Sequence, residues 1–562
     1  MGKRLMIVAA AAAAVGSIAG APLARAGSAS LLASKDNTLF EHPDGLFSNG
    51  AGQYLFVGET SAFGLRRGLV AFDLPSAIPT NAFVTLASLD VVISRAQLQS
   101  NATLHVVTQN WGEGASDAGD PGGGGAVSQT GDATWKHAFF GSTLWNNLGG
   151  DFNPAASATT SMGFGGSTFA DPQMAVDVQN WVANPATNFG WLMKGEEGVS
   201  QSAKRIDSRE TGSSIGPTLN VSWNASTWNV GGGGAWSSNA NWLLGVPGGV
   251  GAEANFFFSS GAAPIAVNVD GPRTVGFLNF DSNNPYTLSG SAITLDRAGN
   301  HSSVSVAQGS HQIQTTLNLD TITDFDIDTG AALHVTTGLT GPAANSIINK
   351  NGDGTLRAAR IRNADLIISG GAVVTDANGS AAGISVLNDL QMAAATTLDL
   401  ANNDLIVNGG NYTTLRDLVI AGVGNPTGII SSTSDGSQIL ALFDNAQVGA
   451  TDWEGIPVAL NSVIGKYTYF GDANIDGQVT GDDYTVIDAN LSTTPPDGLG
   501  WLSGDMNLDG TVTGDDYTVI DANLGLGAGN PLSGSQLVAI PEPVSILLLS
   551  ASALHSFLRR KR

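Results

Sequence analysis

Short apolar segments separated by Gly and Asn dominate the middle of the chain. They are rich in Val, Ile, Leu and Thr, and most follow one another at intervals of roughly 10 to 20 residues, a spacing typical of stacked solenoid coils. The clearest segments are 275–280, 292–295, 303–306, 316–319, 332–335, 365–368, 371–375, 397–400 and 404–407. We therefore predict a β-solenoid-like region over residues 224–456, either alone or combined with a small sandwich.

Residues before this region show a second pattern, in which longer strand-like runs are split by Gly, Asn and Pro. Apolar runs of this kind, bounded by turn-forming residues, are typical of antiparallel β-sheets. They include 66–75, 87–94, 176–181, 188–194 and 217–221. We predict a jelly-roll β-sandwich over residues 27–223, with each of these runs forming a strand.

Composition agrees with a mainly β protein and argues against binding to nucleic acid. The 562 residues include 73 Gly, and only 13% are charged. The formal net charge of −24 disfavours binding to nucleic acid, although a local basic patch could still bind an acidic glycan. The chain has no cysteine, so disulfides cannot stabilise it and bound calcium or large β cores must do so.

The N-terminus has the three parts of a secretory signal peptide. Lys3 and Arg4 precede an apolar run from 5 to 19, and Ala24-Arg25-Ala26 follows it as a small-x-small cleavage sequence. We predict export, with residues 1–26 removed.

The C-terminus carries a second targeting signal. Pro541-Glu542-Pro543 precedes an apolar run at 544–558 and four basic residues at 559–562. This order resembles the PEP-CTERM sorting signal of exported bacterial proteins, which implies a transmembrane sorting helix within 541–562 and recognition by an exosortase. The basic end would stay on the cytoplasmic side. A plain membrane anchor is the alternative, and both place the chain at the cell surface, in the outer envelope or in the extracellular matrix.

An almost verbatim repeat near the C-terminus carries the clearest chemistry. Residues 471–491 recur at 504–524, and each copy places oxygen-bearing side chains at positions 1, 3, 5, 7, 9 and 12 of a calcium loop, with Gly477 or Gly510 at position 6. Calcium is bound by six to eight hard oxygen atoms, which alternate residues of a tightly turned loop supply. The predicted ligands are Asp472, Asn474, Asp476, Gln478, Thr480 and Asp483 in the first copy, and Asp505, Asn507, Asp509, Thr511, Thr513 and Asp516 in the second.

Each loop is followed by one short amphipathic helix, whereas residues 466–470 before the first loop indicate a strand. A loop and a single helix, present twice over 466–527, resembles the type I dockerin repeat. The resemblance implies a small helical module that binds two Ca²⁺ ions, and a cohesin-like protein as a partner. Structural calcium is favoured over signalling calcium, because metal binding contributes directly to folding.

The N-terminal module resembles the DNRLRE-signature family of secreted β-sandwiches, through Asp36-Asn37-Thr38-Leu39, the run at 66–75 and the ending Ser208-Arg209-Glu210. The resemblance implies binding of extracellular polysaccharide. Cations suit the carboxylates of acidic sugars. The candidate contacts are Arg66, Arg67, Lys194, Lys204, Arg205 and Arg209, with Trp111, Trp181 and Trp191 as alternatives that are more simply explained as core residues.

No catalytic motif stands out. The histidines are scattered, and neither a nucleophile elbow nor a phosphate loop is present. The acidic group at 324–328 and Asp353 are the positions that could supply a glycosidase pair, and surface charge is the simpler explanation. The preferred hypothesis is a non-enzymatic surface or matrix protein that binds calcium and possibly polysaccharide. The alternatives are an enzyme that degrades polysaccharide on the solenoid, and a structural spacer or adhesin.

Overall fold

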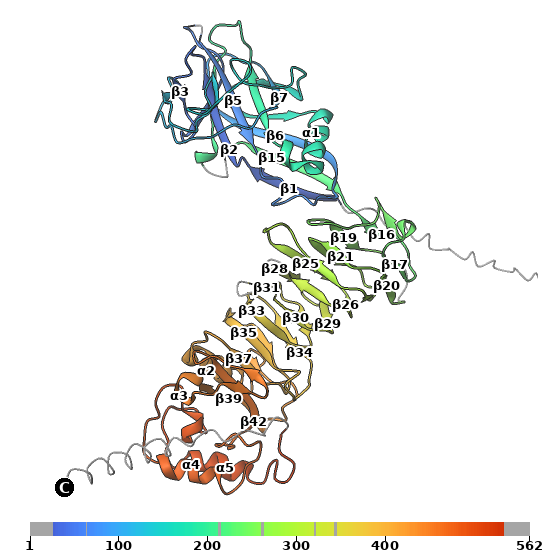
Figure 1. The fold of residues 1–562 in the computed structure, drawn as a ribbon, viewed down its shortest axis with the longest axis vertical. Coiled ribbons are helices and arrows are strands. Elements are labelled where there is room, and N and C mark those ends of the chain that lie inside the picture. Colours follow the sequence, from blue (N-terminus) through green and yellow to red (C-terminus); the bar gives the residue numbers. More distant parts are fainter. Residues whose placement is uncertain are drawn as a thin grey trace, which may run out of the picture.

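The described residues fold into an elongated, mainly β molecule in which three regions follow one another in chain order (Figure 1). The structure is a computed structural model. It describes residues 26–62, 64–211, 215–259, 263–319, 322–341 and 346–532. No helix in this described portion is long and apolar enough to cross a membrane. The predicted sorting helix at 541–562 and residues 1–25 of the predicted signal peptide lie outside it.

The N-terminal region is a set of antiparallel strands around one core. Strand β4 pairs with both β14 and β5, and so links two groups of strands, β1-β15-β6-β14 and β5-β13-β7-β11. The strands are β1 (Ala26–Leu32), β2 (Lys35–Phe40), β3 (Phe47–Ser48), β4 (Tyr54–Glu59), β5 (Leu65–Ala71), β6 (Phe83–Ala96), β7 (Ser100–Val106), β8 (Ala126–Val127), β9 (His137–Phe139), β10 (Thr143–Leu144), β11 (Ala158–Met162), β12 (Gly165–Ala170), β13 (Trp191–Gly195), β14 (Lys204–Asp207) and β15 (Thr218–Asn224). Buried residues of both groups, such as Leu89 and Met193, belong to the same hydrophobic cluster, which indicates that the groups pack face to face.

One predicted strand is wrong. Residues 176–181 belong to helix α1 (Pro172–Ala183), which packs on β6. Asp171 caps this helix by accepting a hydrogen bond from the backbone N–H of Gln173, and Pro172 occupies its first turn. Met174, Val178 and Trp181 lie on one buried face, with the spacing of a helix rather than a strand. Two short 3-10 turns, η1 (Pro185–Thr187) and η2 (Arg209–Thr211), complete the region.

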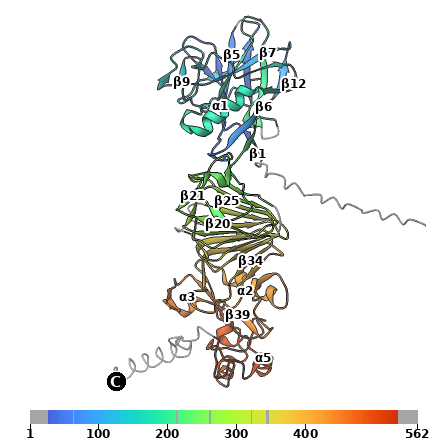
Figure 2. The ribbon, with the colours of Figure 1, turned by 90° about the vertical axis from the view of Figure 1, so that its right-hand side faces the viewer.

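The central region is a parallel β-solenoid with three faces, in line with the sequence prediction (Figure 2). Strands of the first face are β16 (Thr227–Trp228), β19 (Glu253–Phe256), β22 (Phe277–Asp281), β25 (Ser302–Gln308), β28 (Thr323–Ile327), β31 (Ile347–Asn351) and the second halves of β33 (Ile361–Ile368) and β35 (Ser385–Met392). Most of these strands alternate buried and outward side chains, as Thr323–Ile327 does, whereas β19 near the first end is buried along its whole length.

The other two faces are built in the same way. The second face contains β17 (Gly234–Ala235), β20 (Ile265–Val269), β23 (Tyr286–Gly290), β26 (Ser310–Ile313), β29 (Ala332–Val335), β32 (Thr355–Ala358), β34 (Ala372–Thr375), β36 (Thr397–Asp399) and β38 (Gly428–Ile430). The third face contains β21 (Arg273–Val275), β24 (Ile293–Leu295), β27 (Leu317–Leu319), β30 (Leu339–Thr340) and the first half of β33. Because its strands are the shortest, the third face is the narrowest of the three, and we refer to this face as the ridge.

Aromatic side chains close the first end of the solenoid. Trp228, Trp236, Trp242 and Phe256 are buried and pack edge-on or tilted with ring centroids 5.1–6.4 Å apart. Near them lie β18 (Trp242–Leu243) and the 3-10 turn η3 (Asn239–Asn241). Only two residues, 225 and 226, separate β15 from β16 in sequence, and Asn81 of the N-terminal region exchanges hydrogen bonds of 2.7 and 2.9 Å with the backbone of Glu253. The first two regions are therefore directly joined.

The far end of the solenoid is covered by helices and antiparallel strands. These elements are β37 (Leu405–Val407), α2 (Tyr412–Gly422), β39 (Gln438–Asp444), α3 (Asn445–Val448), β40 (Asp452–Trp453), β41 (Ile456–Pro457) and β42 (Val463–Tyr469). The last region follows at once, with α4 (Asp483–Asn490), the 3-10 turn η4 (Trp501–Ser503) and α5 (Asp516–Asn523). One hydrophobic cluster runs from Trp228 through the solenoid to Ile520, so the last region shares its core with the solenoid.

Candidate functional site

The two repeated segments form two similar loop-and-helix units that face each other. Strand β42 leads into the first loop, which ends in α4, and η4 leads into the second loop, which ends in α5. The rings of Tyr484 and Tyr517 stack with centroids 6.1 Å apart. Tyr484 donates a hydrogen bond to Asp521, and Tyr517 donates one to Asp488, each at 2.5 Å. This reciprocal pattern gives the pair of helices approximate two-fold symmetry.

The first and last predicted ligands hold the first loop in its tight turn. Asp472 is fully buried, and its Oδ1 and Oδ2 accept hydrogen bonds from the N–H groups of Asp476 (3.0 Å) and Gly477 (2.8 Å). Gly477 has φ +83°, which favours glycine at position 6. Asp483, also fully buried, accepts hydrogen bonds from backbone N–H groups at both ends of the loop, including that of Thr480 at 2.8 Å.

The second loop repeats these contacts with one difference. Oδ2 of Asp505 accepts a hydrogen bond from the N–H of Gly510 at 3.0 Å, and Asp516 accepts hydrogen bonds from Met506 and Thr513. Oδ1 of Asp505 is buried and has no hydrogen-bond partner. An unpartnered buried carboxylate oxygen is costly and marks a position where a ligand, water or ion is expected.

The remaining predicted ligands lie between these anchors. Oδ1 of Asn474 accepts a hydrogen bond from the N–H of Asp476 at 3.0 Å, and Asp476 accepts one from Gln478 at 2.9 Å. The hydroxyls of Thr480 and Thr513 donate to Asp482 and Asp515, which the calcium-loop pattern does not include. In each copy the acid follows its threonine by two residues. This repetition is the signal that could have identified Asp482 and Asp515 from the sequence.

Burial makes the charged state of these acids expensive. It raises the pKa of Asp472 to about 7, with the neighbouring Asp483 and Asp476 adding to the rise. Burial also raises the pKa of Asp483 to about 6 and the pKa of Asp505 above its usual range. A cation in either loop would supply the positive charge that these carboxylates lack.

The donor atoms fit a hard cation, but carboxylates alone do not form the site. Among the described residues, no three His, Cys, Asp or Glu side chains come together in a group that could hold a metal ion. Each predicted ligand set has three carboxylates and otherwise relies on amide, hydroxyl and backbone oxygens, the ligands that Ca²⁺ accepts. Oδ1 of Asp505 is a carboxylate oxygen that could bind a cation without breaking an existing hydrogen bond.

No family model and no curated protein matches this chain. The interpretation of the two loops therefore depends on their own residues, spacing and contacts.

The first loop is attached to the end of the solenoid. Thr468, on the solenoid strand β42, donates a hydrogen bond from its hydroxyl to Oδ2 of Asp472. Trp501 is buried and donates from its indole N–H to the backbone oxygen of Asp472 at 2.7 Å. The segment after α5 covers the same loop, since the N–H of Leu532 donates to the backbone oxygen of Gly477 at 3.1 Å. These tertiary contacts are not visible in the repeat itself.

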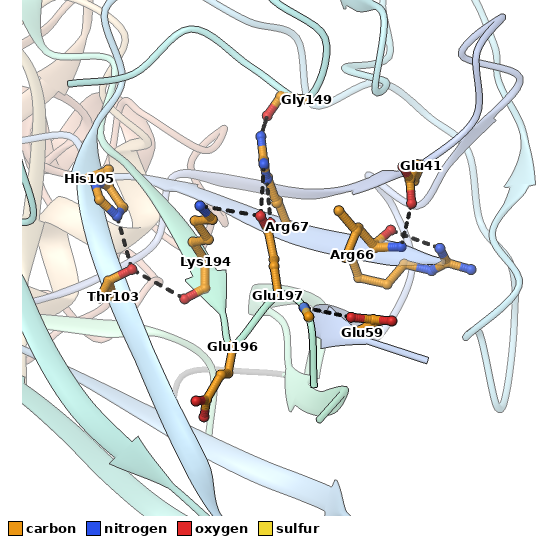
Figure 3. Close-up of polar contacts among 12 residues, drawn as sticks. Glu41, Glu59, Arg66, Arg67, Thr103, His105, Gly149, Lys194, Glu196 and Glu197 are labelled. Carbon is orange, nitrogen blue, oxygen red and sulfur yellow. Dashed lines mark hydrogen bonds and ion pairs between the residues drawn. The ribbon is translucent and has the colours of Figure 1, made fainter. Parts of the chain in front are cut away.

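Three of the cations predicted for glycan binding lie close together in the N-terminal region (Figure 3). Arg67 forms a bidentate ion pair with Glu197, at 2.7 and 3.0 Å, and donates to the backbone oxygen of Gly149. Lys194 lies opposite Arg67 on β13 and contacts the same Glu197 at 3.2 Å. Arg66 donates to the backbone oxygen of Leu65 at 2.8 Å, with its guanidinium over the ring of Phe40.

The other predicted cations are also engaged within the region. Arg205 pairs with Asp120 at 3.0 Å, and Arg209 forms a bidentate pair with Glu113 at 2.6 and 3.0 Å. Lys204 is buried, and its ammonium donates to Ser100 and to a backbone oxygen. Trp111, Trp181 and Trp191 are buried core residues, as the simpler explanation predicted. The cations therefore have structural partners, and the tryptophan rings are not open to solvent.

The candidate catalytic acids lie on the solenoid. Asp324 and Asp326 point outward from the first face, on either side of the buried Phe325. They accept hydrogen bonds from Asn349 (2.6 Å) and Asn351 (2.9 Å) on the next strand. Asp328 and Asp353 are exposed in turns beyond the strands. Each strand acid is thus held by an amide side chain of the neighbouring coil, as expected of a polar ladder on a sheet surface.

Proposed function

We propose that this chain is an exported protein attached to the bacterial surface or its matrix, with a calcium-loaded module closing the membrane-proximal end of a β-solenoid. In this proposal the N-terminal region is a jelly-roll sandwich, residues 466–527 form a dockerin-type module, and the C-terminal signal directs anchoring by an exosortase. Calcium has a structural role.

The observation that carries the proposal is the buried acid pair in each of two nearly identical loops. Asp472 with Asp483, and Asp505 with Asp516, are 0–2% exposed, and no Lys or Arg of the described chain forms an ion pair with them. Buried charges in proteins are paired or coordinate metals. A divalent cation in each loop would balance the charge of the acid pair. It would explain both why the acids are buried and why the ligand positions are spaced as they are.

Isothermal titration calorimetry of the full chain with Ca²⁺ tests this proposal. We expect two ions per chain for the wild type and one ion for Asp472→Asn or Asp505→Asn. Asp417→Asn, which changes an exposed acid on α2, is the matched control and should keep both sites. Absence of Ca²⁺ uptake by the wild type would overturn the proposal, and recovery of the chain from the cytosol after cell fractionation would overturn its exported location.

A spacer role is a second candidate, favoured by the continuity of the molecule. The hydrophobic cluster that extends from Trp228 to Ile520 leaves no break between the solenoid and the calcium module. Such a chain would hold its N-terminal region at a fixed distance from the point of attachment. Small-angle X-ray scattering should then give a rod of constant length in Ca²⁺, whereas a broad distribution of lengths would contradict the spacer role.

A further inference from the structure

The third face of the solenoid carries a row of hydrogen-bonding side chains, one from each coil. Strand pairing places Thr274 beside Thr294, Thr294 beside Asn318, Asn318 beside Thr340, and Thr340 beside Arg362. Neighbouring strands of a sheet lie about 4.8 Å apart, a spacing close to the length of one sugar ring in an extended chain. The row is therefore regular along the solenoid axis.

Most groups in this row remain open to a ligand. Asn318 and Thr340 are exposed, and in the described part of the chain the side chains of the row make one hydrogen bond to each other, a long one of 3.4 Å from Asn318 to Thr294. Within the described residues, the hydroxyls of Thr274 and Thr340 have no hydrogen-bond partner. Hydroxyl and amide groups both donate and accept hydrogen bonds, which matches the hydroxyl groups of a saccharide.

The row ends at two arginines without a carboxylate. Arg360 and Arg362 form no ion pair in the described part of the chain, although the protein has twice as many acidic as basic residues. Nε of Arg360 is buried without a partner, and its NH1 reaches only the backbone oxygen of Ala382 at 3.4 Å. Arg362 donates to the backbone of Ala381 and Ile384. Burial, and then the charge of Arg360, lower the pKa of Arg362. The two guanidinium groups therefore repel each other, and no carboxylate of the described residues pairs with them.

A cavity connects Arg360 with Asn318 and Thr340 of the row. Its volume is about 390 Å³, and it is lined by β27, Thr316, Thr337, Gly338, Thr340, Gly341 and Arg360. No large apolar side chain of this ridge is exposed among the described residues, so the cavity favours a polar ligand.

We propose that this ridge is a binding site for a polysaccharide that carries carboxylate groups, with Arg360 contacting a carboxylate and Asn318 and Thr340 contacting sugar hydroxyls. This inference goes beyond the calcium-binding function and gives the expected polysaccharide a place outside the N-terminal region. At about 0.15 M salt the Debye length is near 8 Å, so contacts at the ridge persist while repulsion from distant acids of the protein is screened.

Binding of a galacturonic-acid hexamer to the full chain, at one fixed Ca²⁺ concentration, tests the proposal. We expect Arg360→Gln to weaken binding about tenfold or more, since it removes a charge-assisted hydrogen bond. Arg357→Gln removes the same charge from the second face, where Arg357 pairs with Asp376, and should leave the affinity unchanged. The methyl-esterified hexamer, which lacks the carboxylate charge, should bind the wild type about as weakly as the acid binds the Arg360 variant.

Thr340→Val provides a second variant in case Arg360→Gln does not fold, and should weaken binding about threefold. The proposal is overturned if the wild type does not bind the hexamer, if Arg360→Gln binds it like the wild type, or if the acid and its methyl ester bind equally. Each of these outcomes leaves calcium uptake unchanged, so failure of this site is distinguishable from failure of the proposed calcium function.

Discussion

The two repeated loops share almost the same sequence but differ in their surroundings. In the first loop, Asp472 accepts a hydrogen bond from Thr468 of the solenoid, and the segment after α5 covers Gly477. In the second loop, Asn507 and Asp509 are exposed, and Asp505 keeps a buried oxygen without a partner. The difference teaches that one repeat unit can acquire different tertiary contacts in its two positions. The first loop belongs to the end of the solenoid, and the second loop faces outward.

Removal of calcium should have the largest effect and should test whether the first loop is part of the solenoid. At 100 times the dissociation constant, each bound ion stabilises the folded state by about 2.7 kcal/mol. We expect a chelator to raise hydrogen exchange throughout residues 470–527 and, to a smaller extent, in β39 and β42, because these elements share one core, while exchange in the N-terminal region stays unchanged. Hydrogen exchange measured by mass spectrometry checks this. Equal protection of β42 with and without chelator would show that the first loop is not part of the solenoid.

Replacing the first ligand of each loop should distinguish the loops without calcium. Asp472→Ala removes the acceptor of three hydrogen bonds around a fully buried group, whereas Asp505→Ala removes fewer, since one oxygen of Asp505 has no partner. We expect Asp472→Ala to lower the calcium-free unfolding free energy by about 1–3 kcal/mol more than Asp505→Ala. Urea denaturation in chelator provides the measurement, and equal losses would show that the surroundings of the loops do not matter.

The effect of pH should be concentrated in the first loop. A carboxyl whose pKa is higher in the folded state stabilises that state when protonated, so the stability of the calcium-free protein should fall as pH rises from about 4 to 7. Ca²⁺ must displace the proton of Asp472, whose pKa is raised to about 7, so affinity at this loop should fall about tenfold between pH 7 and pH 6, and more steeply below pH 6, where Asp483 is also protonated. Calorimetry in buffers of different ionisation enthalpy would detect proton release. Equal release at both loops would contradict the comparison.

Loss of the contact from Thr468 should have the smallest effect, and this effect should be confined to the first loop. Thr468→Val keeps the shape of the side chain but removes the hydroxyl that donates to Asp472. We expect a loss of about 1 kcal/mol in calcium-free stability and an affinity about fivefold lower at the first loop alone. Thr494→Val, at an exposed position between the two loops, is the control. A change at the second loop in calcium titration would indicate a general loss of structure instead.

The sequence predicts local features of this molecule better than distant ones. The strands at 332–335 and 404–407, and the short helix after each loop, follow from apolar spacing, which acts over a few residues. Helix α1 was missed, although Asp171-Pro172 is a recognisable helix start, because the run that follows it is also rich in strand-forming residues. Partners distant in the chain, such as Glu197 for Arg67, are set by the packing of the fold, and no local pattern announces them.

The pairing of β1 with β15 has a mechanical consequence. The strand β15 leads directly toward the solenoid, and all seven residues of β1 pair with it, while β6 pairs with its other edge. A pulling force that enters at Asn224 would act along β15 and strain both ladders in shear. Their hydrogen bonds would then share the load instead of parting one after another. A protein that is held at one end and tugged at the other by flowing liquid would resist extraction of this strand.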